Sequence, residues 1–193
     1  MWPNLESGLS RKIFRLALHT PWLNGAMEFL AQYLIFVVPV VLVIVWLRRD
    51  GLRVVSAATA GAALAVGGAA LIGDAWRRPR PFVMYHFSPL ISHAADSSFP
   101  SDHLAVLGAV GVAVALAARR LGLVILAAAL LVAFSRVYVG VHYVSDVVDG
   151  AALGAVCGGF TWYLTRLAGS SVAAVDVVLQ RLHLRPRDAV DSS

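Results

Sequence analysis

Residues 29–47 read FLAQYLIFVVPVVLVIVWL and contain no charged side chain. A helix needs about 20 predominantly apolar residues to cross the hydrocarbon core of a bilayer, and this stretch is long enough. Residues 54–73, VVSAATAGAALAVGGAALIG, are also uncharged, and their small side chains allow membrane helices to pack closely. These two stretches predict a protein that folds in a membrane.

The composition points the same way. Of the 193 residues, 59% are hydrophobic and 14% are charged, whereas a soluble domain carries about 25% charged residues. The formal net charge is +5, but no basic stretch is interleaved with the aromatic residues that stack on single-stranded bases. We therefore expect the bilayer as a partner and no nucleic acid. In such a protein, arginine sets the topology or binds phosphate.

Three shorter apolar runs follow, at residues 104–118, 121–135 and 150–165. Each is extended at one end by a segment with ionisable residues. We predict an all-α membrane protein with a bundle of about five transmembrane helices and an N-terminal amphipathic interfacial helix. The expected organisation is a single domain over residues 1–193, with the interfacial segment in 1–27, the bundle in 28–168 and a cytoplasmic tail in 169–193.

The arginines predict the orientation of the helices. Basic clusters within residues 48–53, 119–120 and 166–187 fall on one side of the membrane if the chain crosses it five times. The positive-inside rule makes that side cytoplasmic. The basic residues within 11–15 lie on the other side and run against the rule, although an interfacial helix can hold them at lipid headgroups.

The non-cytoplasmic side receives most of the ionisable residues that lie at helix ends. Four of the six histidines are among them. Ionisable groups in or near membrane helices are costly and usually functional, so we expect one site. The residues are Asp74, Arg77, Arg78, Arg80, His86, His93, Asp96, Asp102, His103, Arg136, His142, Asp146 and Asp149. We expect His86 and His93, which lie in a polar loop, to be solvated or part of a lid.

Two stretches on this side are suited to binding an anion. In RRPRPF, which begins at Arg77, alternating prolines hold the backbone extended, and arginines bind phosphate through bidentate hydrogen bonds. In SSFPSDH, which ends at His103, Ser101 is a good helix N-cap, and the helix that it opens presents free N–H groups to an anion. A basic loop at lipid headgroups and an ordinary capped helix are the alternatives.

The third stretch, SRVYVGVHYVSD, begins at Ser135 and carries the candidate nucleophile. His142 and Asp146 are four residues apart, so they share a face if a helix begins near His142. A carboxylate bonded to one ring nitrogen fixes the tautomer and makes the other nitrogen more basic. A metal site is the alternative, but no HxxxH or HExxH spacing exists, and the neighbouring arginines would repel a cation. We expect no metal and no cofactor.

Together these stretches resemble the signature of the type 2 phosphatidic acid phosphatase superfamily, which reads K-x6-R-P, P-S-x-H and S-R-x5-H-x3-D. The matching residues are Arg80-Pro81, Pro100-Ser101-Asp102-His103 and Ser135-Arg136-x5-His142-x3-Asp146. They occur in the same order as in the signature. The chain departs at the first position, where Gly73 stands in place of the lysine.

The resemblance implies a metal-independent phosphatase. His142 would attack phosphorus and form a phosphohistidine, with Asp146 orienting its ring. His103 would protonate the leaving oxygen and then activate water. The phosphoryl oxygens would be bound by Arg80, Ser101 and Arg136, together with backbone N–H groups near Asp102.

Because Gly73 stands where the signature has a lysine, the chain lacks one cation that the signature places at the phosphate site. We expect Arg77 or Arg78 to supply it at the phosphate site. Asp102 places an additional carboxylate beside that site, and a carboxylate repels phosphate unless it is paired. We hypothesise that Asp102 pairs with Arg77 or Arg78.

Within the superfamily, the chain is most similar to bacterial undecaprenyl-diphosphate phosphatases of the bacitracin-resistance type. That resemblance implies removal of the terminal phosphate of undecaprenyl diphosphate at the outer face of the bacterial cytoplasmic membrane, which recycles the carrier lipid for peptidoglycan synthesis. Phosphatidate, phosphatidylglycerophosphate or a prenyl monophosphate are alternative substrates. An alternative of another class is a catalytically silent membrane protein that binds lipid phosphate, although the full set of His103, Arg136, His142 and Asp146 argues against it.

Overall fold

The computed structural model describes residues 4–48, 50–169 and 179. Within them, the regular elements are helical, which confirms the predicted all-α class. The predicted tail lies outside the described residues apart from 169 and 179. The elements are α1 (Asn4–His19), α2 (Pro21–Tyr33), the 3-10 turn η1 (Leu34–Phe36), α3 (Val37–Trp46), α4 (Gly51–Trp76), α5 (Pro81–Tyr85), α6 (Asp102–Ala115), α7 (Arg119–Tyr138) and α8 (Val144–Leu167).

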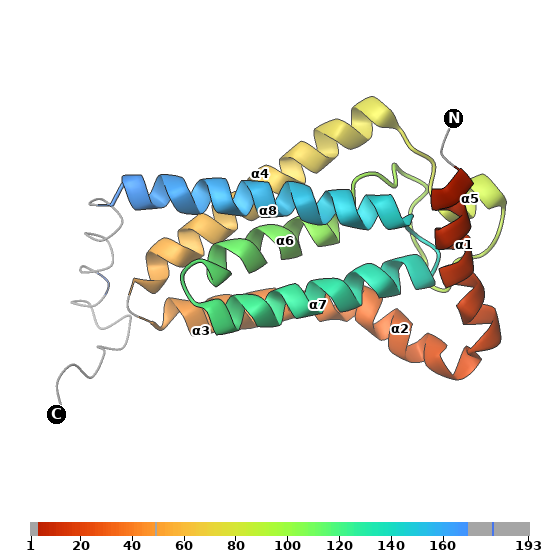
Figure 1. Cartoon of the computed structure of the whole chain (residues 1–193), viewed down its shortest axis with the longest axis horizontal. Helices are drawn as coiled ribbons and strands as arrows, with labels where there is room; N and C mark the ends of the chain where they lie inside the picture. Colours follow the sequence, from red (N-terminus) through yellow and green to blue (C-terminus); the bar gives the residue numbers. More distant parts are fainter. Residues whose placement is uncertain (1–3, 49, 170–178, 180–193) are drawn as a thin grey trace.

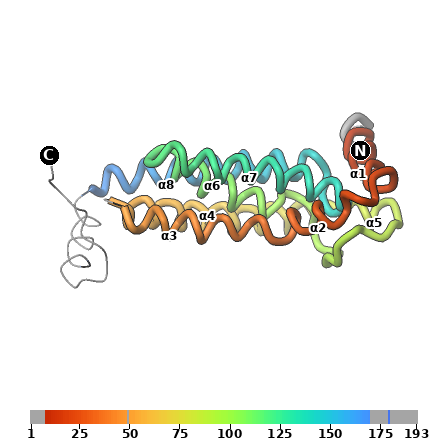
Figure 2. The backbone as a smooth tube through the Cα atoms, turned by 90° about the horizontal axis from the view of Figure 1, so that it is seen from below, coloured from red at the N-terminus to blue at the C-terminus, as the bar shows by residue number. Residues whose placement is uncertain are grey.

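The long helices form an elongated bundle in two layers. Helices α3 and α4 lie in one layer, and α6, α7 and α8 lie in the other (Figure 2). Helix α1 lies across one end of the bundle, beside the short helix α5 (Figure 1). Side chains of both layers form the main core, which includes Val41, Val54, Leu107, Ile125 and Val132.

Among the described residues, four helices are long and apolar enough to cross a membrane. They are Pro21–Trp46, in which α2, η1 and α3 run on as one helix, and Gly51–Trp76, Arg119–Tyr138 and Val144–Leu167. The first begins at Pro21, well before the uncharged run at residue 29, because proline is favoured in the first turn of a helix. A boundary read from hydropathy alone therefore placed the start of this helix too late.

Helix α6 corresponds to the third predicted span, residues 104–118, and it is shorter than the other four. Its 14 residues extend about 1.5 Å each, which is less than the thickness of the hydrocarbon core. It can be short because it is enclosed by protein. Two glycines of α8 let the backbones of α6 and α8 touch, since a Cβ on Gly154 or Gly158 would collide with the carbonyl oxygen of Ala105 or Ala109.

The up-and-down order of the bundle brings four helix ends together beneath α1. These are the end of α4, the start of α6, the end of α7 and the start of α8 (Figure 1). Helix α1 is attached to this end through Ser10, whose hydroxyl accepts a hydrogen bond from the backbone N–H of Val144 (3.0 Å). The Tyr138 hydroxyl lies 2.8 Å from the hydroxyl of Thr20, between α1 and α2. The ionisable residues predicted to share one side do lie at this end.

Candidate active site

His142 lies on the connection between α7 and α8, and its side chain is 3% exposed. Its Nδ1 is 2.9 Å from the carbonyl oxygen of Ser98. A carbonyl oxygen can only accept a hydrogen bond, so Nδ1 carries the proton and Nε2 keeps its lone pair. The local structure therefore fixes the tautomer that a nucleophile requires.

Two buried guanidinium groups flank Nε2 of His142, the ring nitrogen that carries no proton. Nη2 of Arg136 lies 3.1 Å and Nη1 of Arg80 lies 3.3 Å from Nε2. Nη1 of Arg80 also donates to the carbonyl oxygen of Val141 (3.0 Å), and Nη1 of Arg136 donates to that of Ala31 (3.4 Å). Two fixed cations beside one nucleophilic nitrogen suit the binding of a group with several anionic oxygens.

Asp146 contacts the histidine less closely than we expected. Its Oδ2 is 3.5 Å from Nδ1 of His142, farther than the Ser98 carbonyl oxygen. The same oxygen accepts a hydrogen bond from the N–H of Tyr143 (2.8 Å). Asp146 thus supports the histidine electrostatically and holds the start of α8, while the shortest contact to the ring comes from a backbone carbonyl.

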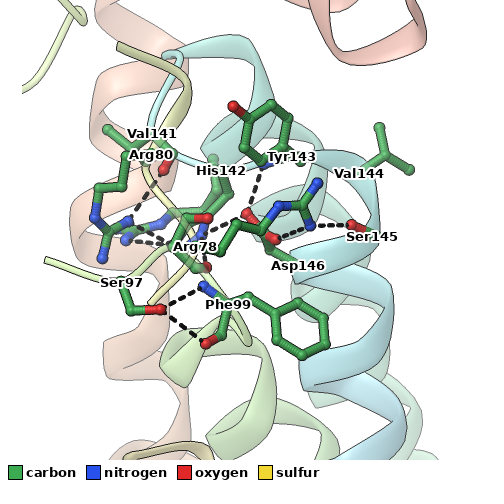
Figure 3. A network of polar contacts seen from close by, with 12 residues as sticks. Arg78, Arg80, Ser97, Phe99, Val141, His142, Tyr143, Val144, Ser145 and Asp146 are labelled. Atoms are coloured by element: carbon green, nitrogen blue, oxygen red, sulfur yellow. Dashed lines mark hydrogen bonds and ion pairs between the residues drawn. The ribbon is translucent and has the colours of Figure 1, made fainter. Parts of the chain in front are cut away.

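Arg78 does not lie where the sequence predicted. Its Nη1 donates to Oδ1 of Asp146 (2.7 Å) and to the hydroxyl of Ser145 (2.6 Å), as Figure 3 shows. Its guanidinium group stacks over the ring of Tyr143, 4.1 Å from the centroid. The pair of Arg78 and Asp146 is buried, so this arginine fixes the carboxylate.

Arg77 and Asp102 also differ from the expectation. Arg77 ends α4 with a positive φ of 48°, is exposed, and donates from Nε to the backbone of Asp74 (3.2 Å). Asp102 is exposed at the start of α6 and has no ion pair within the described part of the chain. The hypothesis that Asp102 pairs with Arg77 or Arg78 is therefore wrong for this structure, because Arg78 is taken up by Asp146 and Arg77 points elsewhere.

A cavity of about 320 Å³ opens in front of Nε2. Its wall includes Arg80, Asp102, His103, Arg136 and His142, which brings together four of the predicted catalytic and phosphate-binding residues with the additional carboxylate. His103 reaches the cavity from the first turn of α6. A group bound there can contact both histidines and both arginines.

Gly73 lines the same cavity. A Cβ placed on it would lie 3.3 Å from the carbonyl oxygen of Phe99 and 3.5 Å from Cβ of Ser97, so the wall is closely packed at this point. Arg77 and Arg78 do not line the cavity. Neither occupies the place of the missing lysine in this structure, and the cationic contacts come from Arg80 and Arg136.

Ser101 is the N-cap residue of α6, but its side chain makes no capping hydrogen bond. The residue is fully buried and does not line the cavity. Its backbone N–H donates instead to the carbonyl oxygen of Asp146 (3.0 Å). Ser101 therefore joins α6 to α8 through its backbone, and its predicted contact with phosphate stays a prediction.

The sequence analysis placed His93 and Asp96 on the side of the site but predicted no contact for either, and it expected His93 to be solvated or part of a lid. Nε2 of His93 lies 3.0 Å from Nη2 of Arg136, and Oδ1 of Asp96 accepts a hydrogen bond from Nε of Arg80 (2.7 Å). His93 and Asp96 thus contact the two arginines that flank His142. Both lie in an irregular loop, where no periodicity indicates which way a side chain points.

Burial and the charges of the arginines together set the protonation of this loop and of His142. Burial, then Arg136 and Arg80, lowers the pKa of His142 well below its ordinary value of 6.5. Burial and Arg80 likewise lower the pKa of His93. Burial opposes ionisation of Asp96, but the hydrogen bond and charge of Arg80 hold its pKa below the usual value. Both histidines are therefore neutral at neutral pH, and Asp96 is ionised.

Within residues 4–48, 50–169 and 179, no group of three or more His, Cys, Asp or Glu side chains is arranged to hold a metal ion. The two side chains that contact Nε2 are the cationic donors Arg80 and Arg136, although carboxylates of Asp96 and Asp102 also line the cavity. This set of donors suits an anionic ligand.

Comparison with known proteins agrees with this geometry. The chain matches the PAP2 superfamily over residues 51–169. Undecaprenyl-diphosphatase BcrC of Bacillus subtilis (strain 168) is 32% identical over 187 residues, which are 92% of this chain and 95% of the relative. A lipid A 1-phosphatase of Rhizobium etli is 41% identical over 89 residues, 44% of this chain and 38% of the relative.

A solved structure has the same fold. The crystal structure of Aquifex aeolicus LpxE superposes with a TM-score of 0.66 at 21% sequence identity, and the match covers 82% of this chain and 95% of that one. At this identity the likeness concerns the arrangement of the helices only.

Proposed function

The chain belongs to the PAP2 superfamily of membrane phosphatases, and we propose that it hydrolyses the terminal phosphate of undecaprenyl diphosphate through a phosphohistidine on His142. One observation carries this proposal. Nε2 of His142 carries no proton, so its lone pair faces two buried guanidinium groups, at 3.1 and 3.3 Å. The arrangement presents a nucleophile and the countercharges for a phosphoryl group at one point.

In the first step, Nε2 of His142 attacks the terminal phosphorus. A P–N bond forms as the bond between phosphorus and the bridging oxygen breaks, and undecaprenyl phosphate leaves. His103, on the cavity wall, donates a proton to the leaving oxygen. The Ser98 carbonyl oxygen keeps the proton of Nδ1 in place and stabilises the positive charge that develops on the ring.

In the second step, water attacks phosphorus, the P–N bond breaks and inorganic phosphate leaves. His103 accepts the proton from that water, which returns both histidines to their starting state. Arg80 and Arg136 hold the phosphoryl oxygens in both steps. One fixed donor to a developing negative charge contributes about 3 kcal/mol, so this pair supplies a sizeable part of the acceleration.

The loop residues His93 and Asp96 tune those two arginines. Asp96 neutralises part of the charge of Arg80 and fixes its Nε, which leaves Nη1 directed at His142. His93 is a neutral acceptor for Arg136. We infer that both act as positioning residues. Each binds one of the two arginines that flank Nε2 of His142, and so fixes where that guanidinium group lies.

The choice of undecaprenyl diphosphate rests on the relatives. The relative that matches along nearly the whole chain is named an undecaprenyl-diphosphatase. Another lipid phosphate is the second candidate, since a lipid A 1-phosphatase is 41% identical over the shorter shared region. The chemistry at His142 would be the same for either substrate.

We propose that the site faces the extracytoplasmic side of a bacterial cytoplasmic membrane. Arg119 and Arg120 begin α7, Arg48 follows α3, and Arg166 lies in the last turn of α8. These helix ends lie at the end of the bundle opposite the connection between α7 and α8 (Figure 1). Basic residues favour the cytoplasmic side of short membrane connections. This orientation would let the enzyme recycle the carrier lipid where wall synthesis releases it.

The test is phosphate release by the purified protein in detergent with EDTA present. Undecaprenyl diphosphate, farnesyl diphosphate, phosphatidate and phosphatidylglycerophosphate are compared as substrates. The proposal expects the highest kcat/KM for the prenyl diphosphates and loss of activity in His142→Ala. His86→Asn is the matched control, because His86 is exposed and outside the cavity.

Preference for a glycerolipid would retain the mechanism and replace the substrate. No release from any substrate in EDTA would contradict the proposal itself.

A further inference from the structure

A second cavity, of about 430 Å³, lies at the end of the bundle farthest from His142. It is larger than the cavity in front of the nucleophile. Its walls come from the connection between α3 and α4, the connection between α6 and α7, and the last turns of α8. These elements meet at the end where α3 and α8 finish (Figure 1).

The charged residues of this cavity are mainly cationic. Among the described residues, Arg48, Arg53 and Arg166 line it, together with one carboxylate, that of Asp50. Asp50 is 3.9 Å from Nη2 of Arg53, in a partly exposed pair. Like charges that share a cavity repel one another unless an anion lies among them. Three guanidinium groups with one carboxylate therefore leave an excess of positive charge that favours an anion.

Two further features of the wall favour an anion in this cavity. The guanidinium of Arg166 lies over the ring of Trp162, 5.0 Å from its centroid, and Trp162 also lines the cavity. Helix α4 begins in the wall at Gly51. The N–H of Gly51 donates to the carbonyl oxygen of Arg48 (3.0 Å), and the first turn of the helix contributes the positive end of the helix dipole. Both features increase the attraction for an anionic group.

We propose that this cavity binds a phosphate group, supplied by the headgroup of an anionic phospholipid. The cavity is formed by the ends of membrane-spanning helices, at the depth where lipid headgroups lie. Basic pockets between membrane helices on one face of a bilayer bind anionic headgroups. The site is separate from the catalytic cavity and shares no residue with it.

The experiment measures lipid and phosphate binding to the full-length protein in nonionic detergent, by native mass spectrometry and thermal unfolding. The probes are phosphatidylglycerol, phosphatidylcholine and inorganic phosphate. The test variant is the double substitution Arg53→Gln with Arg166→Gln. The matched control is Arg119→Gln with Arg120→Gln, which removes the same charge from exposed residues at the same end, outside the cavity. Hydrolysis at the distant catalytic site reports that each variant is folded.

We expect phosphatidylglycerol to bind the unmodified protein and the control variant, and to bind the test variant about 25-fold more weakly, since each of the two basic residues adds roughly fivefold to the affinity. Phosphatidylcholine should bind weakly to all three. If inorganic phosphate alone reproduces the difference between the variants, the cavity binds a phosphate group and its source is a free anion. Equally weakened binding of phosphatidylglycerol in the test and control variants, or unchanged binding in both, overturns the proposal.

Discussion

At the scale of single residues, the central feature is how the imidazole of His142 is held. The sequence indicated that His142, Arg80 and Arg136 would lie at one end of the bundle, and the resemblance to the superfamily signature gave them their predicted roles. It did not predict that a backbone carbonyl, that of Ser98, makes the shortest contact to Nδ1. Main-chain contacts from irregular segments have no residue pattern, and neither do the loop contacts of His93 and Asp96.

Adjacent arginines should differ sharply in their effect on stability. Arg78 is buried against Asp146, whereas Arg77 is exposed. Removing one partner of a buried ion pair leaves the other charge uncompensated and costs about 3–5 kcal/mol, while exposed substitutions stay within about 0.5 kcal/mol. We expect Arg78→Gln to lower the thermal unfolding temperature strongly and Arg77→Gln to leave it nearly unchanged. Similar behaviour of the two variants, with a raised KM for Arg78→Gln, would instead mean that Arg78 binds phosphate.

The buried histidines should make stability depend on pH. Because the pKa of His142 is lowered well below 6.5 in the folded protein, the unfolded chain binds more protons than the folded one below about pH 6.5. Stability therefore falls as the pH decreases through this window and is fully present above it. His93, whose pKa is also lowered, contributes in the same direction.

Thermal unfolding between about pH 7.5 and about pH 5 measures this dependence. His142→Gln should show a smaller decrease in unfolding temperature than the unmodified protein, and the exposed-site variant His86→Asn should show the full decrease. The same decrease in unfolding temperature in His142→Gln and in the unmodified protein would mean that protonation of His142 does not contribute to the pH dependence of stability.

At the scale of elements, hydropathy predicted which segments are helices but not all of their limits. Pro21 starts the first spanning helix, and polarity around residues 20–28 concealed this start. Helix α6 is short, and its place inside the bundle depends on backbone contact with α8. The glycines at positions 154 and 158 permit that contact, but an isolated sequence does not indicate which of several glycines faces which helix.

Neighbouring glycines of α8 offer a test of this packing. A Cβ on Gly158 would collide with the carbonyl oxygen of Ala109, whereas a Cβ on Gly159 would have Cγ1 of Val112 at 3.9 Å as its nearest contact. Gly158→Ala should cost about 1–3 kcal/mol through overpacking. Gly159→Ala should be neutral or stabilise by up to about 1 kcal/mol, because alanine favours a helix. Thermal unfolding in detergent distinguishes the two, and equal effects would refute the close contact of α6 and α8.

At the scale of the whole molecule, the two ends of the bundle differ in chemistry. One end carries a cavity lined by histidines and arginines, and the described residues that line the cavity at the other end include arginines but no histidine. The order of helices, read from hydropathy, was enough to predict this separation, because each crossing reverses the side of the membrane. The sequence did not predict the two cavities, since a cavity depends on how side chains of distant segments pack.

Cysteine labelling in intact cells tests the proposed orientation. Cys157, the only cysteine, is buried and would be replaced by serine. Ala95→Cys then lies in the exposed loop beside the site, and Ala117→Cys lies at the opposite end. A maleimide that cannot cross membranes should label Ala95→Cys in intact cells and Ala117→Cys only after permeabilisation. The reverse pattern would place the site on the cytoplasmic side.

The most direct measurement follows the phosphoryl group itself, with undecaprenyl diphosphate labelled in its terminal phosphate and the reaction quenched during turnover. Undecaprenyl phosphate is a good leaving group, so His103→Asn should slow the attack of water more than the first step, and the intermediate should accumulate. The account predicts an acid-labile label on the peptide that contains His142, stronger in His103→Asn and absent in His142→Ala. Phosphate release without labelled protein in both the unmodified protein and His103→Asn would contradict the account, and so would a label that persists in His142→Ala.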